Sequence, residues 1–129
     1  MTLKKKQEEL LSETLKKIDI VICTALIPGK KAPIIIKKDM IEEMPSGSVI
    51  YDLAASQGGN SELTKVNEII NNDGVIIMGE SNILNKLPVS SSNLYAKNIY
   101  NFISNLFSKE EKKFKINLDD EIIEKTMVK

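Results

Sequence analysis

Two short apolar runs, each followed at once by a loop of small residues, constrain this chain more than any other feature. Residues Ile18–Cys23 and Ser48–Ala54 are apolar at nearly every position, which is typical of parallel strands covered on both faces. A helical pattern over 38–44 lies between them, so the order predicts a right-handed parallel crossover unit. In parallel α/β sheets, ligands bind in the loops that leave the carboxyl ends of strands. The sequence therefore predicts an α/β fold with a site in loops 24–29 and 52–60.

Helices and a β-hairpin are predicted around this unit. Residues 3–17 predict an amphipathic helix with an apolar stripe, formed by Leu10, Leu11, Leu15 and Ile18. Apolar runs flank Asn71–Gly74, and an Asp-Gly pair in such a place is a strong hairpin signal. Pro88 and the serines at 90–92 predict the start and the caps of a long C-terminal helix. Its expected core stripe is Tyr95, Ile99, Phe102, Ile103 and Leu106.

Composition excludes several classes of function. The formal net charge is zero, which gives no electrostatic attraction to nucleic acid or to an anionic membrane. All 18 positive charges are lysines, so the bidentate guanidinium clamp for phosphates is lacking. There is no histidine, the commonest general base at neutral pH. The single cysteine, Cys23, lies in an apolar run and is expected to be a buried, inert thiol.

No catalytic set or metal site can be assembled from these residues. Ser90, Ser91 and Ser92 have no histidine partner and are explained by helix capping. No cluster of Cys and His offers a transition-metal site. The acidic run 119–121 is better explained as a solvated tail than as a cation site. We therefore expect no catalytic residue and no metal ligand in this chain.

The loop after the second strand carries adjacent glycines followed by Asn60. Adjacent glycines let a backbone approach a ligand closely and present its amides, although such a loop can also be a plain turn. Asp52 invites comparison with the acid that holds the ribose in dinucleotide folds. That acid follows a G-x-G-x-x-G fingerprint by ~20 residues, and only Gly29 lies at that distance upstream, outside any such fingerprint. Asp52 is therefore expected to orient the loop rather than to bind ribose.

Four sequence blocks together resemble a known family. They are Thr24–Pro33 (Thr-Ala-Leu-Ile-Pro-Gly-Lys-Lys-Ala-Pro), Gly47–Ala54, Gln57–Asn60 and Leu87–Tyr95. In this order they resemble the alanine dehydrogenase/transhydrogenase family, and within it the NAD(H)-binding domain of the alpha subunit of proton-translocating NAD(P) transhydrogenases. The resemblance extends over almost the whole chain.

The resemblance implies two Rossmann-like subdomains with NAD(H) in the cleft between them. Residues 1–108 match the C-terminal half of the NAD(H)-binding subdomain plus a returning helix, which implies a partial Rossmann-like parallel sheet. Residues 109–129 then form a charged tail or linker. The glycine fingerprint, its ribose-binding acid, the nicotinamide loop and the first subdomain have no counterpart in these 129 residues. The chain is therefore expected to be incomplete and inactive alone.

Cofactor-binding residues follow from the same resemblance. Gln7, on the opening helix, and Leu26, after the first strand, match positions that contact the nucleotide in the family. The remaining candidates line the two strand-end loops: Thr24, Ala25, Gln57, Gly58, Gly59 and Asn60. No catalytic residue is implied, because hydride chemistry belongs to the cofactors. The implied cofactors are NAD(H) here and NADP(H) on a partner domain.

Three functions remain open. The resemblance favours a transhydrogenase, in which hydride transfer between NAD(H) and NADP(H) is coupled to proton translocation. A fragment of an alanine dehydrogenase is the second, although that enzyme carries aspartate where this chain has Ser56 before Gln57-Gly-Gly. The third is a non-catalytic remnant or accessory chain that docks on a complementary subunit. Half a nucleotide fold would leave an apolar face uncovered, so the isolated chain is expected to bind NAD(H) weakly and to self-associate.

Partners and location are implied in the same way. The expected partners are the remainder of the NAD(H)-binding domain, the membrane and NADP(H)-binding domains, and a second copy in the full complex, with no nucleic acid. No apolar run approaches the ~20 residues that span a bilayer, so this chain itself is expected to be soluble. The complex would place it at the cytoplasmic face of a bacterial inner membrane, or at the matrix side in an organelle.

Overall fold

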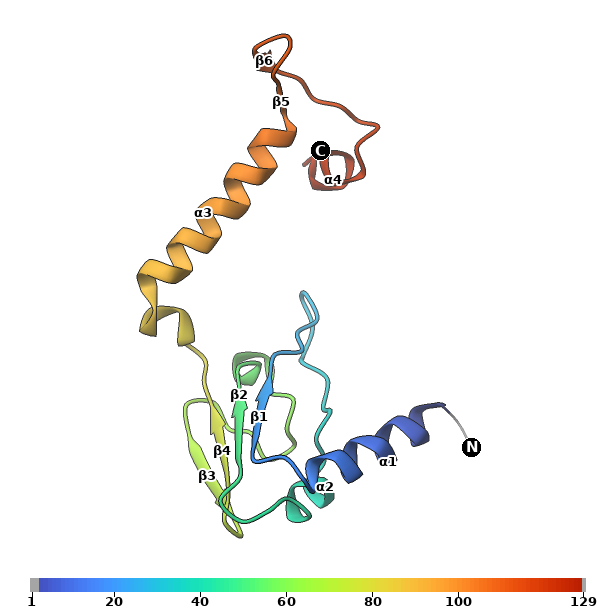
Figure 1. The fold of residues 1–129 in the computed structure, drawn as a ribbon, viewed down its shortest axis with the longest axis vertical. Coiled ribbons are helices and arrows are strands. Elements are labelled where there is room, and N and C mark those ends of the chain that lie inside the picture. Colours follow the sequence, from blue (N-terminus) through green and yellow to red (C-terminus); the bar gives the residue numbers. More distant parts are fainter. Residues whose placement is uncertain (1–2, 129) are drawn as a thin grey trace. The chain divides into compact units, whose positions relative to one another are not determined.

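The computed structural model describes residues 3–128 and divides into two compact units, Met1–Ile83 and Leu84–Lys129. Figure 1 labels their helices and strands. The first unit contains α1 (Leu3–Leu15), β1 (Ile20–Cys23), α2 (Lys38–Glu42), β2 (Val49–Asp52), a 3-10 turn η1 (Ala55–Gln57), β3 (Ile69–Asn72) and β4 (Val75–Gly79). Its four strands form one sheet in the order β1-β2-β4-β3.

The sheet is parallel except at one edge. β1 pairs with β2 and β2 with β4 in parallel, while β3 pairs with β4 antiparallel. The strand–helix–strand unit predicted over residues 18–54 is confirmed, because α2 separates two parallel neighbours. The hairpin is confirmed too: β3 and β4 are joined by Asp73 and Gly74, both with positive φ (49° and 92°). Such φ values at both central residues are those of the turn that favours Asp-Gly.

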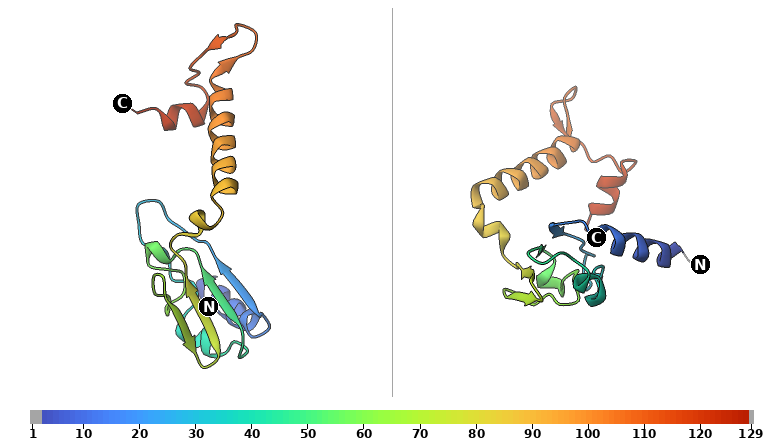
Figure 2. Two further views of the ribbon diagram at one scale, coloured as in Figure 1. Left: turned by 90° about the vertical axis from the view of Figure 1, so that its left-hand side faces the viewer. Right: turned by 60° about the horizontal axis from the view of Figure 1, so that its bottom comes forward.

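One face of the sheet is covered by α1 and α2. Leu15 of α1 and Met40 and Ile41 of α2 form a core with Ile50 of β2 and Ile77 of β4, all buried. Lys37, at the start of α2, also forms an ion pair with Glu8 of α1 (Nζ to Oε2, 3.0 Å). In the left view of Figure 2, α1 and α2 lie behind the sheet, whose opposite face is toward the viewer. The first unit therefore has two layers, one of helices and one of strands.

No element of the first unit covers the other face of the sheet. Two expectations about apolar side chains are therefore corrected. The side chains of Ile20 and Ile22 in β1 are 66% and 65% exposed, so this strand is not covered on both faces. Its apolar run resembles that of a fully buried strand, but residues 3–83 supply a helical layer on one side only. Leu10 is 70% exposed and does not widen the buried stripe of α1.

The second unit contains a long helix followed by two short strands and a short helix. Its elements are η2 (Ile83–Lys86), α3 (Pro88–Asn105), β5 (Phe107–Ser108), β6 (Lys113–Phe114) and α4 (Glu121–Thr126). The first residue of η2, Ile83, is the last residue of the first unit. The long helix is confirmed, but the serine caps are wrong. The N-cap is Leu87, without a side-chain cap, and Pro88 occupies the first turn. Proline suits that position because its φ is already helical, so the serines fall inside the helix.

The expected core stripe of α3 is only partly buried. Phe102 and Leu106 are half-buried, whereas Tyr95 is 69% exposed. The segment after α3, where a charged tail or linker is expected from residue 109 on, contains a small hairpin. In it the rings of Phe107 and Phe114 meet edge to face, with their centroids 5.7 Å apart. Asp120 caps α4 by accepting hydrogen bonds from the Ile122 and Ile123 amides. The assignment of residues 1–108 to one domain and 109–129 to a linker stays a prediction.

Candidate functional site

The two predicted loops leave the same edge of the sheet. Cys23 and Asp52, the last residues of β1 and β2, are paired in register. The Leu53 amide donates to the Cys23 carbonyl (2.9 Å), which extends the pairing into the start of the second loop. Loop 24–29 and loop 53–60 thus begin side by side at the carboxyl ends of adjacent parallel strands, which is where α/β sheets bind ligands.

Asp52 organises the second loop. Its carboxylate is fully buried and accepts four hydrogen bonds. Oδ1 accepts from the Ala54 amide (3.0 Å), and Oδ2 from the Asn60 amide (2.7 Å), the Ser61 amide (3.1 Å) and the Thr64 hydroxyl (2.6 Å). Hydrogen bonds to an ionised acceptor are roughly twice as strong as neutral ones. The expectation that Asp52 orients the loop, rather than binding ribose, is consistent with all four contacts.

Asn60 joins the second loop to the first. Its side chain is fully buried: Oδ1 accepts from the Ala25 amide (2.9 Å), and Nδ2 donates to the carbonyls of Ala25 and Pro33 (both 2.9 Å). The Asn60 carbonyl accepts in addition from the amides of Ile35 and Ile36. A single carboxamide therefore satisfies both backbone groups of Ala25. The two loops form one hydrogen-bonded unit that runs from Asp52 through Asn60 to Ala25.

Gly58 and Gly59 differ in what an added side chain would meet. Both adopt positive φ, 102° at Gly58 and 83° at Gly59, a region that side chains disfavour. A Cβ on Gly59 would lie 2.7 Å from Thr64 Cβ and 2.8 Å from Asp52 Oδ2. A Cβ on Gly58 would meet nothing within 4 Å. Gly59 is thus required by packing around Asp52, whereas Gly58 is exposed and its amide donates to the Ala55 carbonyl (3.0 Å) at the end of η1.

The structure brings some of the predicted site residues together and leaves others apart. Thr24, Ala25 and Asn60 line one cavity of about 280 Å³, which α1 and β1 also line through Leu11 and Val21, among others. Leu26 and Gln57 are exposed on their loops and do not line it. Gln7 is exposed on α1 and does not line it either. Whether Gln7, Leu26 and Gln57 contact a nucleotide stays a prediction.

Two contributors to this arrangement were not predicted from the sequence. Thr64 donates to Asp52 across 12 residues, and Pro33 accepts from Asn60 across 27. No local pattern signals either contact. Only the position of Asn60, directly after the glycines, hinted at its importance.

The two loops contain few groups that could transfer a proton. Asp52 is the one ionisable side chain within loops 24–29 and 52–60, and both of its oxygens are occupied by internal donors. Within residues 3–128 there is no group of three or more His, Cys, Asp or Glu side chains that could hold a metal ion. Among the helices within residues 3–128, none has the length and hydropathy of a membrane span.

Cys23 is buried, as expected. Its thiol is buried at the end of β1, and desolvation, with the charge of Asp52 second, raises its pKa from 9.0 to about 11. Because the thiolate is the reactive form, alkylation by iodoacetamide at about pH 8 is expected to be about 100-fold slower in the folded chain than in urea. Mass spectrometry of the alkylated chain over time measures both rates. Equal rates would show that the thiol is accessible and unperturbed.

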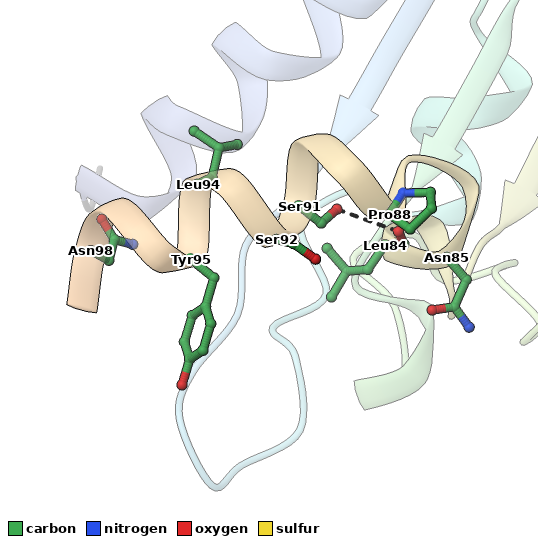
Figure 3. Close-up of a pocket in the computed structure, with 8 residues that line it drawn as sticks. All are labelled: Leu84, Asn85, Pro88, Ser91, Ser92, Leu94, Tyr95 and Asn98. Atoms are coloured by element: carbon green, nitrogen blue, oxygen red, sulfur yellow. Dashed lines mark hydrogen bonds between the residues drawn. The ribbon is translucent and has the colours of Figure 1, made fainter. Parts of the chain in front are cut away.

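A second cavity, of about 450 Å³, lies along the first turns of α3 in the other unit. Figure 3 shows Leu84, Pro88 and Tyr95 around it, with the Ser91 hydroxyl donating to the Leu84 carbonyl (3.3 Å). Its lining contains no charged side chain and no nucleophile with a base beside it. Although it is larger than the cavity beside Asn60, it carries no catalytic arrangement.

Known proteins resemble this chain over almost its whole length. All of residues 1–129 match the family model described as "Alanine dehydrogenase/PNT, C-terminal domain". The chain is 42% identical over 125 residues to an NAD(P) transhydrogenase subunit alpha chain of Rickettsia prowazekii, covering 97% of this chain and 32% of the relative. It is 42% identical over 125 residues to the Rhodospirillum rubrum protein of the same name, covering 97% and 33%. Alanine dehydrogenase 1 of Staphylococcus aureus is 34% identical over 113 residues, covering 84% and 30%.

Solved structures give the same grouping. A transhydrogenase from Sinorhizobium meliloti superposes with a TM-score of 0.67 at 41% identity, over 76% of this chain and 30% of the other. An L-alanine dehydrogenase superposes with a TM-score of 0.65 at 25% identity, over 77% and 28%. The chain thus spans about a third of the length of the relatives it matches, and its sheet is the Rossmann-like sheet of these oxidoreductases. The chain belongs to the alanine dehydrogenase/PNT C-terminal domain family.

Proposed function

We propose that this chain forms one wall of the NAD(H) site of an NAD(P) transhydrogenase, where it supports hydride transfer between NAD(H) and NADP(H) held by a partner domain. The observation that carries the proposal is the Asn60 side chain, which holds Ala25 at the end of β1 against the loop after β2. This places two ordered loops at the sheet edge where dinucleotides bind. Relatives named as transhydrogenase subunits, at 42% identity, support the choice of enzyme.

The residues at this edge suit a nucleotide. NAD(H) supplies the hydride chemistry when it is bound, and the protein supplies position and electrostatics. Leu26 is 55% exposed and offers an apolar surface to a ring of the cofactor. Gln57 offers an exposed carboxamide on the second loop, and the one carboxylate of that loop, Asp52, is occupied by internal donors. The chain's own contribution is therefore to bind and orient the nucleotide.

We also propose that the chain acts as part of a larger assembly. It spans about a third of its relatives, and its sequence contains no G-x-G-x-x-G fingerprint. The pyrophosphate site and the first subdomain would then come from the remainder of the domain, with membrane and NADP(H)-binding domains beyond it and a second copy in the full complex. Alone, the chain binds NAD(H) weakly and has no activity. The assembly would face the cytoplasm in a bacterium or the matrix in an organelle.

A chimera tests the enzyme class. Residues 3–128 would replace the aligned segment of the Rhodospirillum rubrum transhydrogenase alpha chain, and in parallel that of Staphylococcus aureus alanine dehydrogenase 1. We expect the first chimera to bind NADH and, with its partner subunits, to reduce an NADP analogue. Alanine-dependent NAD reduction by the second chimera, without activity of the first, would overturn the proposal.

Leu26 gives a sharper test of the nucleotide contact. In the transhydrogenase chimera, Leu26→Ala is expected to weaken NADH binding about 5-fold to 10-fold, because about 1–1.5 kcal/mol of apolar burial is lost. Its neighbour Ile27 is also exposed, so Ile27→Ala is the matched control, with an expected change below about 2-fold. Titration by calorimetry measures both. Equal effects of the two substitutions would remove Leu26 from the site.

A further inference from the structure

The turn between β3 and β4 contains a reactive pair of residues that the nucleotide site does not use. Asp73 and Gly74 are its two central residues, and Asp73 is exposed. The turn precedes β4, so it lies at the amino end of the parallel strands, away from loops 24–29 and 52–60. An Asp-Gly pair is prone to rearrange, because glycine has no side chain to shield its amide nitrogen.

The rearrangement needs no catalyst. The Gly74 amide nitrogen loses its proton and bonds to Asp73 Cγ, and the proton and the carboxyl oxygen leave as water. The product is a cyclic succinimide, which water then opens at either carbonyl. Opening at Cγ restores aspartate, whereas opening at the Asp73 backbone carbonyl gives isoaspartate, in which the chain runs through Cβ and Cγ. The water that was lost is regained, and nothing is oxidised or reduced.

The folded turn restrains the nitrogen that must attack. The Gly74 amide donates to Oδ1 of Asn71, on β3 (2.9 Å). This bond keeps the proton on the nitrogen and fixes its direction, so attack on Asp73 Cγ requires the bond to open first. The Gly74 carbonyl accepts from the Gly47 amide (2.8 Å), and a Cβ on Gly74 would overlap Ser46 Oγ. Gly74 is therefore held at both backbone groups.

We propose that Asp73 is a site of spontaneous conversion to isoaspartate, and that the Asn71 side chain slows this conversion in the folded chain. Isoaspartate lengthens the backbone between Asp73 and Gly74 by one methylene group. The Gly74 carbonyl then moves away from the Gly47 amide, which lies just before β2. The modification loosens the turn at the amino end of the sheet. No step involves NAD(H), so this site is independent of the proposed function.

Ageing of the full 129-residue chain tests the site. The purified chain is kept at neutral pH and physiological temperature, either folded or in urea. A protein isoaspartate methyltransferase with a labelled methyl donor measures isoaspartate over time, and peptide mass spectrometry locates it. We expect formation at Asp73 to be at least about 10-fold slower in the folded chain than in urea, because the reaction requires local opening of the turn. Asn71→Ala is expected to raise the folded rate about 5-fold, the effect of one lost hydrogen bond.

Two matched variants separate the Asn71 hydrogen bond from other effects of substitution in β3. Asn71→Asp keeps an acceptor oxygen for the Gly74 amide. Asn72→Ala removes a buried Nδ2 that makes no hydrogen bond within residues 3–128. Both variants are expected to form isoaspartate within about 2-fold of the wild-type rate.

Amide hydrogen exchange by NMR gives a readout that does not depend on ageing. In Asn71→Ala the Gly74 amide is expected to exchange about 5-fold faster, while the Ile76 amide, which donates to the Ser48 carbonyl (2.9 Å), keeps its protection. Equal isoaspartate formation in the folded chain and in urea would overturn the proposal. So would an Asn71→Ala rate no higher than that of Asn72→Ala. Faster exchange of Ile76 together with Gly74 would also overturn it, because the hairpin would then open as a whole.

Discussion

Replacing Asp52 with alanine is expected to lower the free energy of unfolding of this chain by about 4 kcal/mol. The substitution leaves three backbone amides, those of Ala54, Asn60 and Ser61, and the Thr64 hydroxyl without their acceptor in a buried site. Each unsatisfied buried donor costs about 1–3 kcal/mol, less where water enters the vacated space. Urea unfolding followed by circular dichroism measures the change.

A matched substitution separates this network from a general effect of charge removal. Asp19 is exposed and lies just before β1, so Asp19→Ala is expected to change the unfolding free energy by less than about 0.5 kcal/mol. Asp52→Asn keeps the shape and one acceptor oxygen, and it should fall between the two. If Asp52→Ala and Asp19→Ala were equally mild, the loop would not depend on the buried carboxylate.

Gly59→Ala is expected to destabilise the chain by about 3–4 kcal/mol, the second large effect, because two costs combine. The positive φ costs about 1–2 kcal/mol for a residue with a Cβ, and the overlap with Thr64 and Asp52 costs about 1–3 kcal/mol. The added Cβ would lie 2.8 Å from Asp52 Oδ2, which holds the loop, and 2.7 Å from the Cβ of Thr64, whose hydroxyl donates to that oxygen. Neither can move without breaking a hydrogen bond.

Gly58→Ala is the matched control, because this substitution has the cost of a positive φ but no steric overlap. Its φ is 102° and no atom lies within 4 Å of the added Cβ, so a loss of about 1–2 kcal/mol is expected. The difference between the two glycines in thermal or urea unfolding therefore isolates the packing around Asp52. Similar losses for both would mean that the loop around Gly59 relaxes freely.

Much of the fold could be predicted from short-range patterns. The apolar runs located β1 and β2, and the Asp-Gly pair located the turn between β3 and β4. What failed was information that depends on neighbours in space. The exposure of Ile22 could not be predicted, because an apolar run does not say whether a covering layer exists in the same chain. The serine caps were wrong for a local reason: Pro88, which was predicted to start the helix, occupies its first turn, so Ser90–Ser92 lie inside α3.

The site shows the same limit. Asp52 was expected to orient its loop because its spacing ruled out ribose binding, and its four hydrogen bonds fit that expectation. The bridge from Asn60 to Ala25 joins residues 35 positions apart and has no sequence signal. The family resemblance predicts that the loops line a nucleotide site, but it does not say how the loops are held together. The contact that makes one wall out of two loops is visible only in three dimensions.

The bridge made by Asn60 has a consequence for how a ligand would be received. Because Asn60 occupies both backbone groups of Ala25, the conformational entropy of the two loops is lost when the chain folds, not when a nucleotide arrives. Binding to a surface ordered in advance avoids that loss and gains affinity without any additional contact. Under the proposed function, the two loops act as a rigid template, and a closing movement of the complete site would come from the part that lies opposite them.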